Sequence, residues 1–314
     1  MLLRLAHRFG ILVLSLFASS LVVFGFMQVL PGNPARVALG VNASDAAVAQ
    51  MTTDYGLDRS LVVQYLDWVA GMLTLDPGIE YVSKAPIGPQ IADRLGVTLW
   101  LVLAAMILAF VFAVPMGTWM AVRHRHLDGV ALSGVSQIGV AIPAFLAGIV
   151  LISVFAVRLG WVPSGGWVPP AEDPVEFLRR LVLPAVALAL VQGSVLARYV
   201  RSAVLDVLRE DYLRTARAKG LRPMNALWKH GLRNAAVPVV TVLGLQLATL
   251  LVGAVVIERV FVIPGLGSLL IDSVAGRELL TVQTVVMVLV VAVLVINFVV
   301  DAMYLAIDPR LRAA

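Results

Sequence analysis

The sequence contains no cysteine, little lysine and few charges. Of 314 residues none is cysteine, which excludes disulfides and thiolate metal sites. Charged residues make up 14% of the chain and hydrophobic residues 60%; soluble domains average about 25% charged residues. A soluble protein of this composition would expose large apolar patches, which soluble monomers avoid. The composition therefore indicates a membrane protein.

Motifs for nucleotide binding and for catalysis in the membrane are also missing. None of the three lysines, Lys84, Lys219 and Lys229, lies in the glycine-rich context of a phosphate-binding loop, so we expect no cofactor on this chain. There is no His-Glu-x-x-His zinc motif, and the four histidines lie at predicted span ends or in loops. We predict no catalytic residue and no metal site, and hence no enzyme.

The hydrophobic residues are concentrated in long blocks. The hydrocarbon core of a bilayer is about 30 Å thick and a helix rises about 1.5 Å per residue, so a span needs about 20 apolar residues. Six blocks are candidates: residues 9–30, 97–121, 130–157, 182–200, 237–257 and 284–307. The first block is longer than the apolar region of a signal peptide, and we interpret it as a retained anchor. The sequence predicts an all-α integral membrane protein with about six transmembrane helices.

Basic residues indicate the orientation, because cytoplasmic loops are enriched in arginine and lysine. With both termini inside, the inner segments hold most of the basic residues: Arg4, Arg8, Arg123, Arg125, the dense stretch 201–233, Arg310 and Arg312. The outer segments then hold most of the acids. The net charge of +5 is thus a signal of topology, and we expect membrane lipid and no nucleic acid as a partner.

This topology divides the chain into three parts. Residues 1–30 form the cytoplasmic N-terminus and first span, 31–96 a long extracytoplasmic segment, and 97–314 a core of five spans. In the outer segment we expect a short helix over 45–53 capped by Ser44 and a second helix from Ser60. The second carries the apolar residues Leu61, Tyr65, Trp68, Val69 and Met72 on one face. That face could lie on the membrane surface or pack on the spans, and packing is favoured.

The inner loop at about 201–235 has a distinctive pattern. Leu205, Leu208, Tyr212 and Ala216 recur at three- and four-residue spacing, which predicts one face of a helix. Gly220 then predicts a left-handed stop, and a new helix runs from the following proline into the fifth span. The pattern predicts a helix–glycine–helix knob in the cytoplasm, with small residues at its tip. An ordinary basic loop that only sets topology is the alternative, but it explains neither the small tip nor the apolar stripe.

The same loop resembles the permease signature of bacterial ABC importers. The resemblance lies in the run Asp211-Tyr212-Leu213-Arg214-Thr215-Ala216-Arg217-Ala218-Lys219-Gly220, followed by His230-Gly231-Leu232-Arg233-Asn234-Ala235 and Pro238. It is most similar to the first permease subunit of the dipeptide/oligopeptide and nickel transporters. It extends along nearly the whole chain, through Pro31-Gly32-Asn33-Pro34, Ile142-Pro143-Ala144-Phe145, Pro264-Gly265-Leu266-Gly267 and Asp308-Pro309-Arg310. The general signature has Glu-Ala-Ala where this chain has Thr215-Ala216-Arg217.

The resemblance implies a type I ABC importer permease fold and a set of partners. These are a second homologous permease, two ATPase subunits that bind ATP and magnesium, and an extracytoplasmic peptide-binding protein, with a peptide as substrate. The membrane would be the bacterial cytoplasmic membrane. By the same resemblance, the ATPase-coupling surface would consist of Tyr212, Thr215, Ala216, Ala218, Gly220 and Leu221.

Uncharged polar residues inside the predicted spans are candidates for the translocation path. They are Ser133, Gln137, Gln192, Gln246, Thr249 and Asn297. Each could equally hold helices together, as polar side chains do in membranes. A proton-coupled secondary transporter is the alternative function, because ionisable groups at membrane depth mark proton relays. Asp301 is the well-embedded acid that such a transporter would use, although a hydrogen bond to Tyr304 or a neighbouring helix is the preferred reading.

Overall fold

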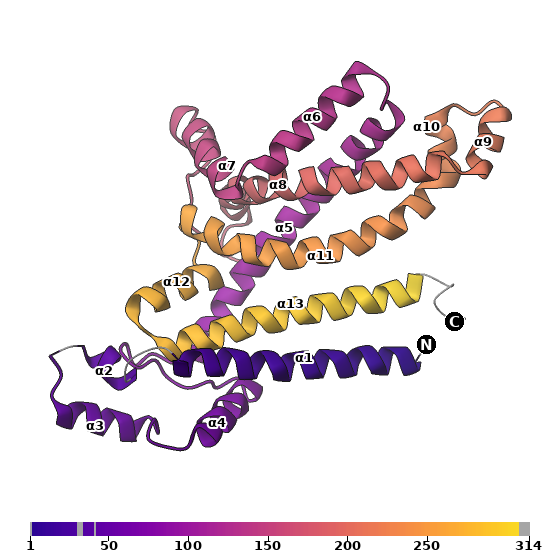
Figure 1. The fold of residues 1–314 in the computed structure, drawn as a ribbon. Helices are drawn as coiled ribbons and strands as arrows, with labels where there is room; N and C mark the ends of the chain where they lie inside the picture. Colours follow the sequence, from indigo (N-terminus) through magenta and orange to yellow (C-terminus); the bar gives the residue numbers. More distant parts are fainter. Residues whose placement is uncertain (1, 30–33, 41, 308–314) are drawn as a thin grey trace. The chain divides into compact units, whose positions relative to one another are not determined.

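The computed structural model describes residues 2–29, 34–40 and 42–307, which are almost entirely helical (Figure 1). Its only pairing of extended chain among these residues is an isolated antiparallel bridge between Ile79 and Pro86. The helices are α1 (Leu2–Val29), α2 (Pro34–Leu39), α3 (Asp45–Asp54), α4 (Leu61–Leu73), α5 (Ile87–Val122), α6 (Leu127–Ala141), α7 (Ala144–Leu151), η1 (Ile152–Arg158), α8 (Pro174–Leu208), α9 (Asp211–Ala218), α10 (Pro223–Ala226), η2 (Leu227–Gly231), α11 (Leu232–Val260), α12 (Leu266–Gly276) and α13 (Leu279–Ile307).

Five of these helices, α1, α5, α8, α11 and α13, are long and apolar enough to cross a membrane. They correspond to five of the six predicted spans. The third span, predicted over 130–157, is bent: α6 and the α7–η1 segment meet at an angle of 100°, and the pair makes a sixth span if it crosses the membrane as one broken helix. The break lies at Ile142, which has an extended backbone (φ −84°, ψ 122°) before Pro143. Proline lacks an N–H donor and disfavours helical geometry in the residue before it, so the helix ends there.

The chain forms two compact units, and α1, α5 and α13 each have residues in both. The first unit consists of Met1–Leu5, Leu99–Ile263 and Ile296–Ala314. Within it α8 and α11 pack along each other, and α6 and α7 pack against α8. Small residues allow α5 to approach α8 closely: a side chain at Gly117 would lie 2.5 Å from the carbonyl oxygen of Ala197. Ser136 of α6 donates a hydrogen bond to the carbonyl of Ser194 in α8 at 2.9 Å.

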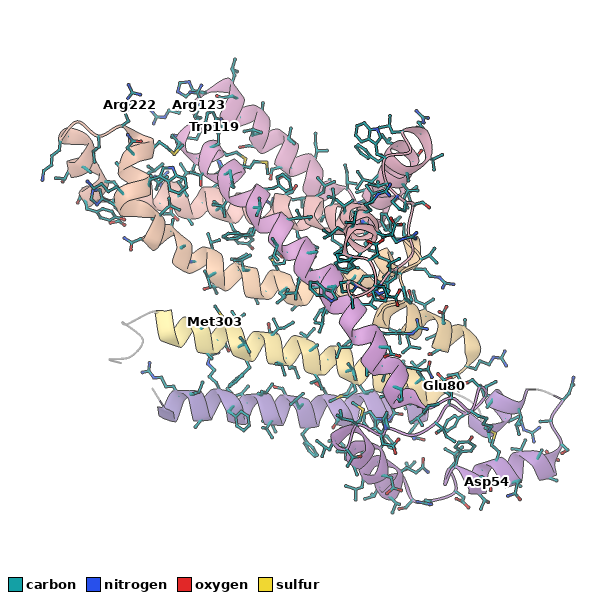
Figure 2. The ribbon with its side chains drawn as sticks, turned by 180° about the vertical axis from the view of Figure 1, so that it is seen from behind. Asp54, Glu80, Trp119, Arg123, Arg222 and Met303 are labelled. Atoms are coloured by element: carbon teal, nitrogen blue, oxygen red, sulfur yellow. The ribbon has the colours of Figure 1, made fainter. Side chains whose placement is uncertain are left out.

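The turn between α5 and α6 holds one of the predicted inner basic clusters (Figure 2). Arg123 forms an ion pair with Asp128 at 2.6 Å. The indole nitrogen of Trp119 donates to the same carboxylate at 2.9 Å, and the Arg123 guanidinium lies over the Trp119 ring at 5.6 Å from its centroid. The cluster places the Asp128 carboxylate in the first turn of α6, where the helix dipole favours a negative charge.

The second unit consists of Ala6–Thr98 and Pro264–Val295. Its helices α3 and α4 begin after Ser44 and Ser60, whose hydroxyls accept hydrogen bonds from Ala47 and Val63, as predicted. Phe24 of α1, Trp68 of α4 and Met287 of α13 form a buried cluster. The α4 stripe therefore packs on the spans, as predicted, although Leu61 at its start stays 55% exposed.

Two polar contacts reinforce this packing. The hydroxyls of Ser20 and Tyr65 are 2.7 Å apart and share a hydrogen bond. The indole nitrogen of Trp68 donates to the hydroxyl of Thr284 at 3.4 Å. Since water is absent at membrane depth, buried polar groups in spans need partners of this kind.

A second set of contacts attaches the loop 79–86 to the start of α13. The carboxylate of Glu278, which is 6% exposed, accepts hydrogen bonds from the backbone N–H groups of Tyr81, Val82 and Ser83 at 2.7–3.1 Å. Glu80 in that loop is also 6% exposed and accepts from the hydroxyl of Thr281 at 3.0 Å. Two buried acids thus hold the outer segment to a spanning helix.

Candidate functional site

The knob predicted between the fourth and fifth spans is present in the first unit. It consists of α9, the turn 219–222, α10 and η2, and it lies at one end of α8 and α11 (Figure 1). The prediction of one helical face through Leu205, Leu208, Tyr212 and Ala216 is wrong, because α8 ends at Leu208 and α9 begins at Asp211. Because of this break, the apolar face of α9 begins about one residue later than the spacing predicts.

The inner face of α9 is therefore formed by Leu213 and Ala216. Leu213 is fully buried and Ala216 is 9% exposed. Both belong to a core cluster with Val204 and Val207 of α8 and Leu227 of η2. Burial of these side chains against the end of α8 gives the short α9 the tertiary support that a helix of two turns needs.

A glycine allows the three segments of the knob to meet. A Cβ at Gly231 would lie 2.8 Å from Leu227 Cδ1, 2.9 Å from Val207 Cγ1 and 3.3 Å from Leu213 Cδ1. Two of these distances are below 3.0 Å, so a side chain here would make its neighbours shift, and all three neighbouring atoms are ends of side chains that can move. Gly231 thus lets the three segments pack closely at the base of the knob.

Gly220 has a different role, in the turn that ends α9. Its φ is +94°, a backbone conformation that residues with a side chain disfavour. The turn is closed by hydrogen bonds from the N–H of Lys219 to Thr215 O at 3.1 Å and from the N–H of Leu221 to Ala216 O at 3.3 Å. The predicted left-handed stop is confirmed. Apart from its chain neighbours, no described residue has an atom within 4 Å of a Cβ built at Gly220, so this tip is open.

Tyr212 ties the outer face of α9 to the next span. Its hydroxyl accepts a hydrogen bond from the side-chain nitrogen of Asn234 in α11 at 2.9 Å, while 38% of the residue stays exposed. Asp211 and Arg214 pair on the same helix at 3.4 Å, although both are exposed and such pairs contribute little. Tyr212 is therefore both part of the surface and part of the attachment.

The predicted coupling residues divide into exposed and inward-facing groups. Tyr212, Thr215, Ala218 and Gly220 are exposed, Leu221 is half-buried against the core cluster, and Ala216 faces inward. The sequence analysis did not include Trp228, which lies on η2 and is 65% exposed. An aromatic residue in the basic run Trp228-Lys229-His230 is the signal that could have identified it, since tryptophan is enriched at contact surfaces.

The predicted path residues lie on α6, α8, α11 and α13. Gln137 of α6 is exposed and accepts a hydrogen bond from Arg198 of α8 at 3.2 Å. Ser133 and Thr249 donate to carbonyls of their own helices, those of Gly129 and Leu245. Gln192 and Asn297 are half-buried. Ser133, Gln137 and Thr249 thus each have a hydrogen-bond partner within the first unit.

Gln246 differs from the others. It is 8% exposed, and its side-chain nitrogen has no hydrogen-bond partner within the described residues. Thr249, three residues further along α11, is exposed. Asp301 is half-buried and engaged in an interaction; the side chain of Tyr304, its expected partner, lies outside the described residues.

Comparison with protein families identifies the chain. Residues 113–313 match the family of binding-protein-dependent transport system inner membrane components, and residues 1–102 match the N-terminal model of such membrane components. The chain belongs to this family. It is a multi-pass inner membrane permease of an ABC importer, as the resemblance implied, and the secondary transporter based on Asp301 is not favoured. A family of transport-system membrane components also accords with the expectation that the chain is no enzyme.

Individual relatives cover almost the whole chain. The glutathione transport system permease protein GsiC of Salmonella choleraesuis (strain SC-B67) is 40% identical over 302 residues, which are 96% of each chain. GsiC of Escherichia coli (strain K12) is 39% identical over the same length. Among solved structures, an inward-facing form of the MetNI methionine ABC transporter matches with a TM-score of 0.60 and 22% identity, over 69% of this chain and 96% of that chain. The permease fold is thereby confirmed.

Proposed function

We propose that this permease forms half of the translocation path of an ATP-driven peptide importer. A second homologous permease completes the path, and two separate ATPase subunits bind the ATP and magnesium. The observation that carries the proposal is the knob: α9 is packed on α8 through buried side chains, and its exposed side ends in the open tip at Gly220. A rigid element of this kind can transmit a movement of a bound ATPase to the spans.

The proposed ATPase contact consists of the exposed residues Tyr212, Thr215, Ala218 and Gly220, with Trp228 beside them. Ala218 and Gly220 have small or no side chains, so a partner can approach the backbone closely. Trp228 offers a large apolar surface of the type that anchors interfaces. Leu221 and Ala216 support this surface from below, because they pack into the core cluster.

Placing the knob in the cytoplasm requires both termini inside. The basic residues of the α5–α6 turn and of the knob support this orientation through the enrichment of cytoplasmic loops in arginine and lysine. The segment from Pro34 to Pro86 then faces outward, where we place docking of an extracytoplasmic peptide-binding protein. Its attachment to α13 through Glu80 and Glu278 connects that docking region to a spanning helix.

The cargo is proposed to be a small peptide. The relatives at 39–40% identity are glutathione permeases by name, and glutathione is a tripeptide. The candidate path residues Gln192, Gln246 and Asn297 carry uncharged amides, which suit a conduit for peptides of varied sequence. The buried, unpartnered amide nitrogen of Gln246 is the one most in need of a further partner.

Co-purification tests the proposal. The tagged chain is expressed with its neighbouring transport genes and purified in mild detergent. We expect ATPase subunits to be retained by the native chain and to be lost when Ala218 and Gly220 are replaced by bulky residues. A chain that purifies alone, or as a homo-oligomer, would contradict the proposal.

A further inference from the structure

The second unit contains a polar cavity of about 310 Å³ that the proposed function has not used. It lies among the outer end of α1, the α3–α4 turn, the loop before α5 and the first turns of α13. Cavities that bind small molecules measure roughly 300–1,000 Å³, so this one has room for one or two amino-acid residues. All residues that line it belong to the second unit.

Two side chains in the cavity have unused hydrogen-bonding capacity. Gln283 of α13 is only 6% exposed, lines the cavity, and makes no side-chain hydrogen bond with the described residues. Asp76 lines the cavity from the loop on its opposite side and is exposed. No cation within the described part of the chain pairs with its carboxylate. The Gln283 amide and the Asp76 carboxylate are thus both available to a ligand with donor groups.

The charge of the cavity favours a cation. Its lining includes one arginine, Arg59, and two acids, Asp67 and Asp76. Arg59 is already paired with Asp67 at 2.9 Å, which leaves Asp76 as the uncompensated charge. Around the cavity wall, the Glu278 carboxylate accepts from the backbone N–H of Tyr81 and the Lys84 ammonium donates to the Tyr55 hydroxyl, so these two charges offset each other.

Tyr55 and Tyr81 form an aromatic wall that suits an ammonium group. Their rings meet edge to face with centroids 5.0 Å apart. The Lys84 ammonium lies over the Tyr55 ring, 4.5 Å from its centroid, so Tyr55 is already used and Tyr81 is the ring of this wall left for a ligand's ammonium group. Burial, then Tyr55 and Glu278, raises the pKa of Tyr81 to about 12, so its hydroxyl remains protonated and neutral.

The remaining walls are mixed: Gln28 and Gln64 add polar groups, and an apolar part favours an organic cation over a metal ion. Phe24, Trp68 and Leu280 contribute to the cavity. Trp68 and Pro77 also line a neighbouring cavity of about 900 Å³ that is almost entirely apolar. An ammonium ligand with an apolar side chain could therefore place its charge near Asp76 and its side chain toward Trp68.

We propose that this cavity binds the amino-terminal ammonium group of the peptide cargo, with Asp76 and Gln283 as its polar partners. The assignment rests on the proposed function, since it takes a small peptide as the ligand. It adds an outer binding site at a defined position, formed by the segment before α5 and the start of α13. It also implies a requirement for a free amino terminus.

The test measures peptide binding to the complete transporter, purified without its binding protein and reconstituted in lipid nanodiscs. The probe is radiolabelled alanyl-phenylalanine, compared with N-acetyl-alanyl-phenylalanine in equilibrium dialysis. We expect the acetylated peptide to bind at least about tenfold more weakly, because it lacks the ammonium that forms the charge-assisted contact. Equal binding of the two peptides would overturn the proposal.

Matched variants locate the site. Asp76→Asn and Gln283→Met should each weaken binding of the free dipeptide roughly three- to tenfold, with unchanged assembly and melting temperature. Asp54→Asn is the control: Asp54 is an exposed acid of α3 (Figure 2) that accepts a hydrogen bond from Gln50 at 2.7 Å and does not line the cavity. If Asp76→Asn and Asp54→Asn bind the dipeptide as tightly as the native transporter, the site assignment is wrong.

A further experiment distinguishes the peptide cargo from another ligand that carries an ammonium group. A lysine of the docking binding protein would also bring an ammonium group to the outer surface. If Asp76→Asn weakens docking of the binding protein and leaves dipeptide binding unchanged, the assignment to cargo is overturned. If any of these tests fails while ATPase subunits still co-purify with the chain, this inference is wrong and the proposed function still stands.

Discussion

The side-chain nitrogen of Asn234 lies 2.9 Å from the hydroxyl oxygen of Tyr212, and this hydrogen bond joins the first turn of α9 to the first turn of α11. The two residues are 22 positions apart in the chain. Together with Leu213 and Leu227 in the core beneath them, they connect the exposed surface of the knob to a spanning helix. A force on α9 would therefore reach α11 through a short, defined contact.

Removing this hydrogen bond should weaken coupling. Tyr212→Phe keeps the ring and loses the acceptor, and a typical hydrogen bond contributes about 1 kcal/mol, so we expect peptide uptake to fall up to about fivefold. Asn234→Leu should have a similar effect, and the double variant should be no worse than either alone. Tyr199→Phe is the control, since Tyr199 is 50% exposed on α8 and makes no described hydrogen bond. Additive losses in the double variant would contradict a shared contact.

Gly220 should be required for transport but not for membrane insertion. With φ at +94°, a β-branched residue would strain the turn by about 1–3 kcal/mol and displace the tip. We expect Gly220→Val to abolish uptake while membrane levels stay normal. Gly134→Val is the matched control, because Gly134 also has no atom within 4 Å of a built Cβ and lies within α6. Normal uptake by Gly220→Val would refute the importance of the tip.

Glu278 should control the order of the loop 79–86. Replacing it with glutamine removes the charge that three backbone N–H groups bind. The NH2 group of the glutamine side chain would then face backbone N–H groups, and two donors form no hydrogen bond with each other. Hydrogen–deuterium exchange of the Tyr81–Ser83 amides should then accelerate about tenfold or more, since charge-assisted hydrogen bonds are about twice as strong as neutral ones. Glu172→Gln, at an exposed acid of another loop, should leave exchange at these amides unchanged. Unaltered exchange in Glu278→Gln would show that other contacts hold the loop.

Tyr81 should make stability sensitive to alkaline pH. Burial, then the nearby Tyr55 and Glu278, raises the pKa of Tyr81 from 10.0 to about 12. A raised pKa means that folding favours the neutral phenol, so this contribution to stability is complete below pH 10 and is lost as pH rises toward 12. Thermal melts between pH 9 and pH 12 should fall less steeply for Tyr81→Phe than for the native chain. Identical slopes would contradict the assigned environment of this phenol.

The spans could be predicted from sequence because their cause is local. An apolar block long enough to cross the hydrocarbon core needs no knowledge of its neighbours, and the helix starts at Ser44 and Ser60 follow from capping alone. The bend at Pro143 could not be predicted with the same rule. Pro115, Pro184 and Pro238 lie inside continuous helices, so tertiary packing decides which proline ends a span.

The knob shows a similar limit. Its helix, left-handed glycine and second helix were predicted, since each depends on neighbouring residues. The orientation of α9 was not, because the break after Leu208 turned Leu213 and Ala216 inward and left Tyr212 at the surface. The cavity at Asp76 and Gln283 could not be predicted either. These two residues are 207 positions apart in the sequence, and only the fold brings them to one site.

The central claim is that the knob contacts an ATPase. The chain has no native cysteine, so Ala218→Cys provides a single attachment point on the exposed side of α9. A maleimide–benzophenone reagent placed there in native membranes is activated by light, and the products are identified by mass spectrometry. The account predicts crosslinks to an ATPase subunit, with a yield that changes when ATP is added, and no such crosslinks from Ala131→Cys on the exposed side of α6. Crosslinks only to lipid or to other copies of this chain would contradict it.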